Sequence, residues 1–201
     1  RDYSSYSFNT NLSWDFFERN FTLGMSHAQF FEDFHPIAAF VVQNQGEKRI
    51  SSSVINFAQT LSPRTLLSGS AGYTQSWGYL GHPYTPIVLI TGELLPESLP
   101  SSKNSMAIAT QIVQGFYLGE YLSTARLKYR YYTDSWGLKA NTTELQLSRY
   151  LAEWISMRLR LRHHIQFAND FAQSSFTGSE PYRTADIRFY SFQSYLSGIQ
   201  F

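Results

Sequence analysis

The feature that most constrains this sequence is an alternation of apolar and polar side chains in blocks of about ten residues. In the clearest block, from Trp154 to Phe167, apolar residues at alternate positions are separated by polar or basic ones. Side chains of a strand point alternately to its two faces. The block therefore predicts a strand with one apolar face and one polar face. Its length is also typical of a tilted strand that crosses a membrane.

Similar blocks recur along the chain, and helical spacing is almost absent. Clear alternation is found at residues 7–16, 21–26, 126–131 and 142–148, and further strands are expected at 51–61, 65–77 and 105–116. The seven prolines fall between these blocks, as a hydrogen-bonded sheet requires. The segment 183–201 is expected to form either a hairpin or one long strand with a bulge. The single strand would bring the chain to nine strands.

The expected connections come in two sizes that tend to alternate. Short turns are predicted at 17–20, 62–65, 118–122 and 150–153, and long segments at 31–48, 78–104 and 168–182, with 133–137 as a short exception. Aromatic residues gather near the strand ends, as in the two girdles of a membrane barrel. Short turns at one end and long loops at the other are typical of outer-membrane barrels. The alternative is a soluble sandwich or lipocalin-like barrel.

These patterns predict an all-β fold, an antiparallel up-and-down transmembrane β-barrel with about nine or ten strands in this chain. Residues 1–201 are expected to form one domain in a bacterial outer membrane, with the lipid bilayer as its partner. Bacterial single-chain barrels have even strand numbers, and the chain opens at Arg1 without a signal segment. We therefore expect part of a larger barrel, incomplete at one or both ends. The expected lipid-facing residues are Leu127, Tyr129, Leu145, Leu147, Met157, Leu159 and Leu161.

Composition excludes several classes of function. A net charge of +1 gives no basic field for nucleic acid, and the absence of cysteine removes thiolate chemistry. His163 and His164 are adjacent, so a strand would point them to opposite faces. No nucleophile elbow or phosphate-binding glycine loop occurs. We therefore expect no metal, no cofactor and no catalytic residue, and the chain is not predicted to be an enzyme.

The strongest chemical feature is a pair of basic rows on the polar faces of two predicted strands. We call these six residues the basic rows: Arg126, Lys128 and Arg130, and Arg158, Arg160 and Arg162. Glu144 lies on the strand between them and is expected to pair with Lys128 or Arg160. An electropositive lumen would favour anions. The competing interpretation is an interior in which these charges satisfy one another.

Two functions follow from these interpretations. The first is a passive, porin-like pore for small anionic solutes. The second is a closed structural barrel that serves as a scaffold or sheath for a protein partner in the envelope, such as a lipoprotein or a cytochrome. An outer-membrane enzyme is a more distant third.

The predicted connection 78–104 is more apolar than a solvated loop, with Pro86 to Ile90 and Leu94 to Pro96. It could constrict the lumen, pack against a partner, or cover the rim with a small core of its own.

Three stretches resemble a Gram-negative outer-membrane barrel family of unknown function. They are residues 127–137 (LKYRYYTDSWG) followed by 143–147 (TELQL), residues 61–67 (LSPRTLL) and residues 78–84 (GYLGHPY). The resemblance implies an outer-membrane β-barrel and no particular activity. It also implies that the chain covers roughly the latter half of a longer barrel, since family members extend beyond its length.

Overall fold

A computed structural model describes residues 3–34, 46–81 and 86–201. Nine strands form one antiparallel sheet in which consecutive main strands are neighbours. This confirms the predicted all-β, up-and-down fold. The strands are β1 (Tyr3–Phe16), β2 (Phe21–Phe34), β3 (Gly46–Ser62), β4 (Thr65–Gly78), β7 (Ser102–Leu118), β8 (Tyr121–Asp134), β9 (Lys139–Ala152), β10 (Ile155–Phe167) and β11 (Phe192–Gln200).

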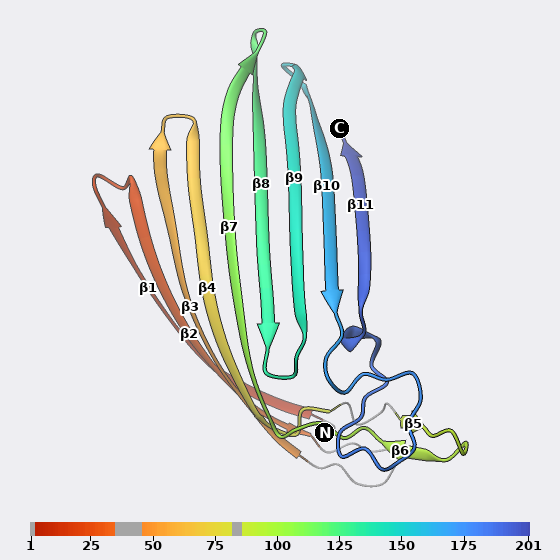
Figure 1. Ribbon diagram of the computed structural model, residues 1–201. Helices are drawn as coiled ribbons and strands as arrows, with labels where there is room; N and C mark the ends of the chain where they lie inside the picture. Colours follow the sequence, from red (N-terminus) through yellow and green to blue (C-terminus); the bar gives the residue numbers. More distant parts are fainter. Residues whose placement is uncertain (1–2, 35–45, 82–85) are drawn as a thin grey trace.

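The sheet is strongly curved, and its two edge strands, β1 and β11, stand apart (Figure 1). In the described part of the chain, β1 pairs only with β2, and β11 pairs only with β10. Both edge strands run towards the end of the sheet that carries the short turns (Figure 1). No helix in the described ranges is long and apolar enough to cross a membrane.

The short and long connections separate to opposite ends of the sheet, as expected. Four tight turns lie at one end, and the long connections and the short β8–β9 turn lie at the other (Figure 1). The predicted connection 31–48 was too long, because β2 continues to Phe34 and β3 begins at Gly46. The rest of that connection, residues 35–45, lies outside the described residues, as do residues 82–84 of the GYLGHPY stretch and residue 85.

The chain end differs from both expectations for 183–201. Only Phe192–Gln200 forms a strand, preceded by the 3₁₀ helix η1 (Ile187–Phe189) and irregular backbone. There is no hairpin, and the strand is shorter than the single long strand that was predicted. It nevertheless makes the ninth strand. The turn predicted at 150–153 lies slightly later, because β9 continues to Ala152.

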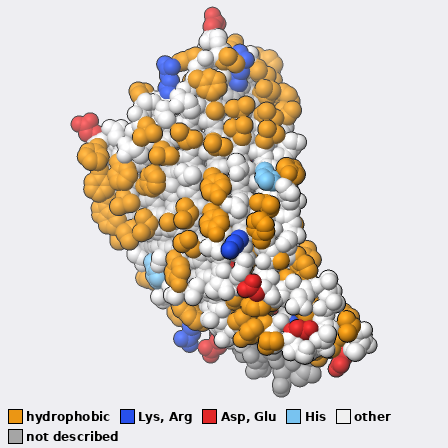
Figure 2. Space-filling view, in the orientation of Figure 1, with side chains coloured by type: hydrophobic (Ala, Val, Ile, Leu, Met, Phe, Trp, Pro, Cys, Tyr) orange, Lys and Arg blue, Asp and Glu red, His pale blue; other side chains and the backbone are white. Residues whose placement is uncertain are grey.

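Over the middle of the sheet, register places most polar and most apolar side chains on opposite faces. Residues paired directly across antiparallel strands point to the same side. We call a set of residues that are paired in this way from strand to strand a level of the sheet. One level contains small and polar residues and is continuous from β1 to β11: Ser13, Gly24, Asn56, Ser70, Ala109, Arg130, Thr142, His164 and Ser194. On the other face, a level three residues away along the strands is largely apolar: Phe16, Phe21, Gln59, Leu67, Ile112, Leu127, Leu145, Leu161 and Ser197. Figure 2 shows hydrophobic side chains spread over this second face, with few charges.

Two long connections fold together at the loop end of the sheet. We call their described residues, 79–81, 86–101 and 168–191, the cap. The β4–β7 connection contains a two-stranded ribbon of β5 (Pro86–Val88) and β6 (Leu94–Pro96). Ile87 of β5 and Leu89, which directly follows β5, form a small core with Phe176 of the β10–β11 connection. The small core expected for this apolar connection is present, but it is shared with the β10–β11 connection, whose Phe176 and Ala185 pack in it.

Candidate functional site: a basic concave face

A hollow of about 540 Å³ lies on the polar face of the sheet. Its lining comes from six strands, β3, β4, β7, β8, β9 and β10, with Asn56 at one side and Arg162 at the other. Side chains from strands so far apart in the sheet can line one hollow only on its concave side. The polar face is therefore the concave face, and the apolar face of Figure 2 is convex.

The basic rows lie on this concave face. Lys128 and Arg162 are paired in register with Glu144 from its two sides, so these three side chains share one level. Arg126 and Arg160 share the next level through Gln146. Arg130 lies at the level of Thr142 and His164, and Arg158 at the level of Ser148. The register therefore places both basic rows on one face of the sheet, as predicted.

Glu144 is the charged centre of the site. Its residue is 7% exposed, and its carboxylate accepts hydrogen bonds from Arg160 at 2.9 Å (Nε) and 2.5 Å (Nη2). Lys128 Nζ lies 3.4 Å from the other carboxylate oxygen. The sequence predicted a pair with Lys128 or Arg160, and both pairs are present. Arg162, although opposite Glu144 in register, is not among its ion pairs in the described part of the chain.

Three of the remaining four cations lie against neutral groups. Arg126 donates to Gln146 Oε1 at 3.2 Å, and Arg158 donates to Gln200 Oε1 at 3.3 Å. Arg130 lies 5.7 Å from the centre of the Tyr132 ring. Over the levels that the basic rows span, Glu144 is the one carboxylate on the described part of β8, β9 and β10. This wall of the concave face consequently carries a large surplus of positive charge.

From β2 to β7, the middle levels of the concave face are built mostly from small side chains. From β2 to β7 the inward positions at the middle levels are Gly24, Ser26, Ala28, Ser52, Val54, Asn56, Ala58, Ser68, Ser70, Gly72, Thr74, Ser105, Ala107, Ala109 and Gln111. Such side chains project little from the backbone, so they leave space opposite the basic wall. Sequence reasoning did not single out this small-residue wall, although the Ser, Gly and Ala residues were visible at alternate positions.

The residues predicted to face lipid lie on the convex face. Leu127, Tyr129, Leu147 and Leu161 are 39–47% exposed. Leu145, Met157 and Leu159 alternate with the inward polar residues of β9 and β10 and are half-buried. These seven side chains form one continuous apolar surface over three strands, although contact with lipid remains a prediction.

Other chemistry is sparse. No group of three or more His, Cys, Asp or Glu residues with the geometry of a metal site occurs in the described ranges. His164 faces the concave side, where its Nδ1 lies 2.7 Å from Thr142 Oγ1. His163 faces the other side and stacks on Tyr195 with a centroid distance of 4.8 Å.

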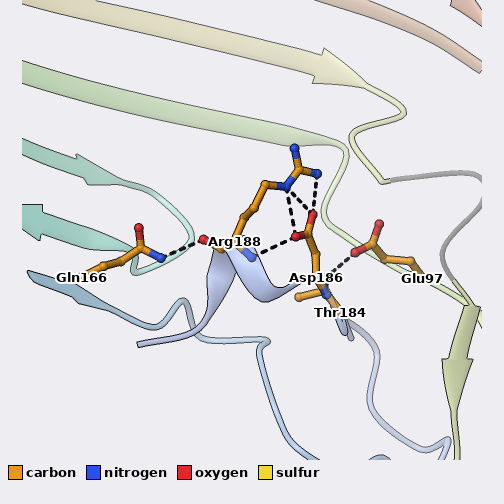
Figure 3. Close-up of polar contacts among 5 residues, drawn as sticks. All are labelled: Glu97, Gln166, Thr184, Asp186 and Arg188. Atoms are coloured by element: carbon orange, nitrogen blue, oxygen red, sulfur yellow. Dashed lines mark hydrogen bonds and ion pairs between the residues drawn. The ribbon is translucent and has the colours of Figure 1, made fainter. Parts of the chain in front are cut away.

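Polar contacts tie the two connections of the cap together (Figure 3). Thr184 is fully buried and donates to the Glu97 carboxylate, which lies on the other connection. Asp186 receives hydrogen bonds from the Arg188 guanidinium at 2.5–3.0 Å, and these bonds raise the Arg188 pKa. Gln166, at the end of β10, donates to the Arg188 carbonyl at 2.7 Å. The cap is therefore a folded unit joined to the sheet.

A second acidic residue orders an exposed turn of the cap. The Glu180 carboxylate accepts hydrogen bonds from the backbone of Thr177 at 3.0 Å and of Gly178 at 2.9 Å. These bonds, led by the one from Thr177, lower the pKa of Glu180 to about 2. Glu180 is therefore ionised at any physiological pH.

The cap is attached to the sheet at the short β8–β9 turn. Trp136 is 2% exposed, donates its indole N–H to the Ser102 carbonyl at 2.9 Å and makes edge contacts with Phe171 and Phe189. Its own carbonyl accepts from the Asp170 backbone N–H at 2.8 Å. Asp134 holds the turn by accepting from the backbone N–H groups of Trp136 and Leu138. The TDSWG segment thus connects the sheet to the β10–β11 connection.

Gly137→Ala is expected to loosen the cap. Gly137 has φ +85°, which costs an L-residue about 1–2 kcal/mol, and a Cβ there would overlap the Asp170 carboxylate. Proteolysis of the folded protein within residues 168–191 should therefore accelerate roughly tenfold. Gly92→Ala is the matched control, because Gly92 also has φ +85° but no described atom within 4 Å of such a Cβ. Equal cleavage of both variants would contradict the proposed attachment.

The comparisons with known proteins give one positive result. A family model described as "Protein of unknown function (DUF3570)" matches residues 1–201. The search of curated proteins and the search of solved structures gave no match.

Proposed function

We propose that this chain, which belongs over its whole length to the uncharacterised DUF3570 family, forms part of a bacterial outer-membrane β-barrel that passes small anions. The observation that carries the proposal is the division of one curved sheet into an apolar convex face and a polar, basic concave face. Water-soluble sheets that expose one face place the polar residues there. A sheet that faces lipid outside and water inside needs the opposite arrangement.

The exposure of the convex face supports a lipid environment. Ile55, Ile108, Leu127 and Leu161 lie on four different strands and are 44–49% exposed. Soluble monomers rarely expose continuous apolar patches above a few hundred Å². A bilayer would cover this face without any further protein layer. The strands β1–β4 and β7–β10 have 13–17 residues each and are long enough to cross a bilayer at a tilt.

Closure of the sheet is part of the proposal. An edge strand with unpaired backbone groups cannot lie in the hydrocarbon region. Since β1 and β11 run in the same direction, an all-antiparallel barrel needs an odd number of further strands between them. The total is then even, as in bacterial barrels of this type, with the short turns in the periplasm.

An open lumen is favoured over a filled scaffold barrel by the small-residue wall. A closed structural barrel fills its interior with side chains. Here Ser70, Ala109 and their neighbours leave a hollow opposite the basic rows. Charged residues that face open water in a lumen repel one species of ion and attract the other, and a surplus of Arg and Lys favours anions.

Ion conduction by the intact protein in planar bilayers tests the proposal. We expect discrete channels whose reversal potential in a KCl gradient shows preference for chloride. The triple variant Arg130→Gln, Arg158→Gln and Arg162→Gln should shift the preference towards potassium, because it removes cations that have no carboxylate partner among the described residues. Arg160 is retained because it holds Glu144.

The control removes the same charge elsewhere. Arg19, Arg49 and Lys139 lie at a turn or on the convex face, away from the hollow. Changing these three residues to Gln should leave the reversal potential unaltered. Absence of channels from correctly folded protein would overturn the pore and favour the closed scaffold.

A further inference from the structure

The basic rows form a ladder along the direction of the strands. Their six cations occupy four successive levels: Arg158; Arg126 with Arg160; Lys128 with Arg162; and Arg130. Successive levels are two residues apart along a strand, or about 7 Å. On the two shared levels the cations flank β9, about 10 Å apart at the backbone. An anion that leaves one level would therefore meet the next cation within a short step.

The chemistry of the ladder is that of guanidinium groups. Five of the six cations are arginines. A guanidinium presents a planar fork of N–H donors that matches two oxygens of a carboxylate or phosphate, whereas the lysine ammonium acts as a point charge. A chloride ion gains little from a fork. A tetrahedral oxyanion can accept from forks on both sides.

Donors remain available for such an anion. Among the described residues, neither Arg162 nor Arg130 has a carboxylate partner, and the Arg130 guanidinium lies 5.7 Å from the centre of the Tyr132 ring. Glu144 neutralises only part of the charge of Lys128 and Arg160. The hollow of about 540 Å³ in front of Lys128, Arg130 and Arg162 is large enough to hold a phosphate or sulfate ion.

We infer that the ladder binds divalent tetrahedral oxyanions, of the phosphate and sulfate class, more tightly than chloride and passes them from level to level. This inference rests on the proposed anion-conducting barrel. It adds that selectivity arises from arginine forks in addition to net positive charge. Inorganic phosphate and sulfate should then occupy the lumen long enough to interrupt the flow of chloride.

The test measures chloride current through the intact protein while phosphate or sulfate is added. We expect both oxyanions at millimolar concentration to reduce the current. The variant Arg130→Lys, Arg158→Lys and Arg162→Lys keeps every charge and removes three forks. It should retain the chloride preference while the concentration of phosphate needed for half inhibition rises about tenfold.

Each outcome separates the inference from the proposed function. Channels that prefer chloride but are insensitive to phosphate and sulfate would overturn the inference and leave the pore standing. Equal inhibition of the wild type and the lysine variant would also overturn it, since charge alone would then suffice. Inhibition by phosphate without inhibition by sulfate would overturn the shared class. A protein that inserts into bilayers without forming channels would overturn the proposed function itself.

Discussion

Replacing Ile108 by Arg is expected to destabilise the membrane-inserted protein by about 2–4 kcal/mol. Ile108 lies in the middle of β7 on the apolar convex face and is 44% exposed. If this face contacts hydrocarbon, the guanidinium must leave water near the bilayer midplane. Urea unfolding from lipid vesicles, followed by the fluorescence of the four tryptophans, would measure the loss.

The neighbouring residue provides the matched control. Ala107 precedes Ile108 on the same strand, points to the concave face and pairs in register with Gly72 and Tyr132, away from the direct partners of the basic rows. Ala107→Arg adds the same side chain to the same strand at almost the same depth, but into a space that is proposed to hold water. We expect a change below about 1 kcal/mol for this variant. Equal destabilisation by the two substitutions would contradict a lipid-facing convex side.

The fold was predictable because strand periodicity is local information. In β10 each apolar residue at an odd position is separated from the next by an arginine or another polar residue, and the observed register keeps these two sets on opposite faces. Such a pattern fixes which side chains share a face, but it does not fix where a strand ends. Phe31 to Phe34 remain in β2 because they pair with Arg49 to Gly46 of the next strand. No residue within β2 alone indicates that pairing.

The candidate site was predictable to the extent that it depends on strand order. With β8, β9 and β10 joined by short turns, Glu144 had to lie between the two basic rows. Which cations it would bind depends on side-chain conformation, and Arg160 reaches it diagonally although Arg162 is directly opposite. The direct neighbour in register is therefore not always the ion-pair partner.

The cap was not predictable, because its contacts join residues far apart in the sequence. Glu97 and Thr184 are 87 residues apart and meet only because both connections lie at the same end of the sheet. The segment TDSWG did carry a signal. A short hairpin turn does not need a buried tryptophan and a glycine of positive φ. These two residues are explained by the attachment of the β10–β11 connection to the turn.

Glu144→Gln is expected to reduce stability by about 1.5–3 kcal/mol, the range for hydrogen bonds to charged groups. The substitution removes the carboxylate that binds Arg160 and Lys128, while an amide of the same shape keeps the packing. The two cations then repel each other and the rest of the basic rows without compensation. Because their side chains are 40–41% exposed, salt should screen part of this repulsion.

The salt dependence makes this prediction specific to charge. Unfolding of the variant and of the wild type should be compared at 0.1 M and 1 M KCl, and the difference in free energy should shrink at the higher concentration because the Debye length falls from about 10 to about 3 Å. Glu120→Gln, in the exposed β7–β8 turn, should change stability by less than about 0.5 kcal/mol at either concentration. A destabilised Glu144→Gln protein with no response to salt would indicate lost hydrogen bonding alone. A variant as stable as the wild type would mean that water solvates each cation of the concave face separately. Glu144 would then be dispensable to the fold, and every cation of the basic rows would be free to bind a passing anion.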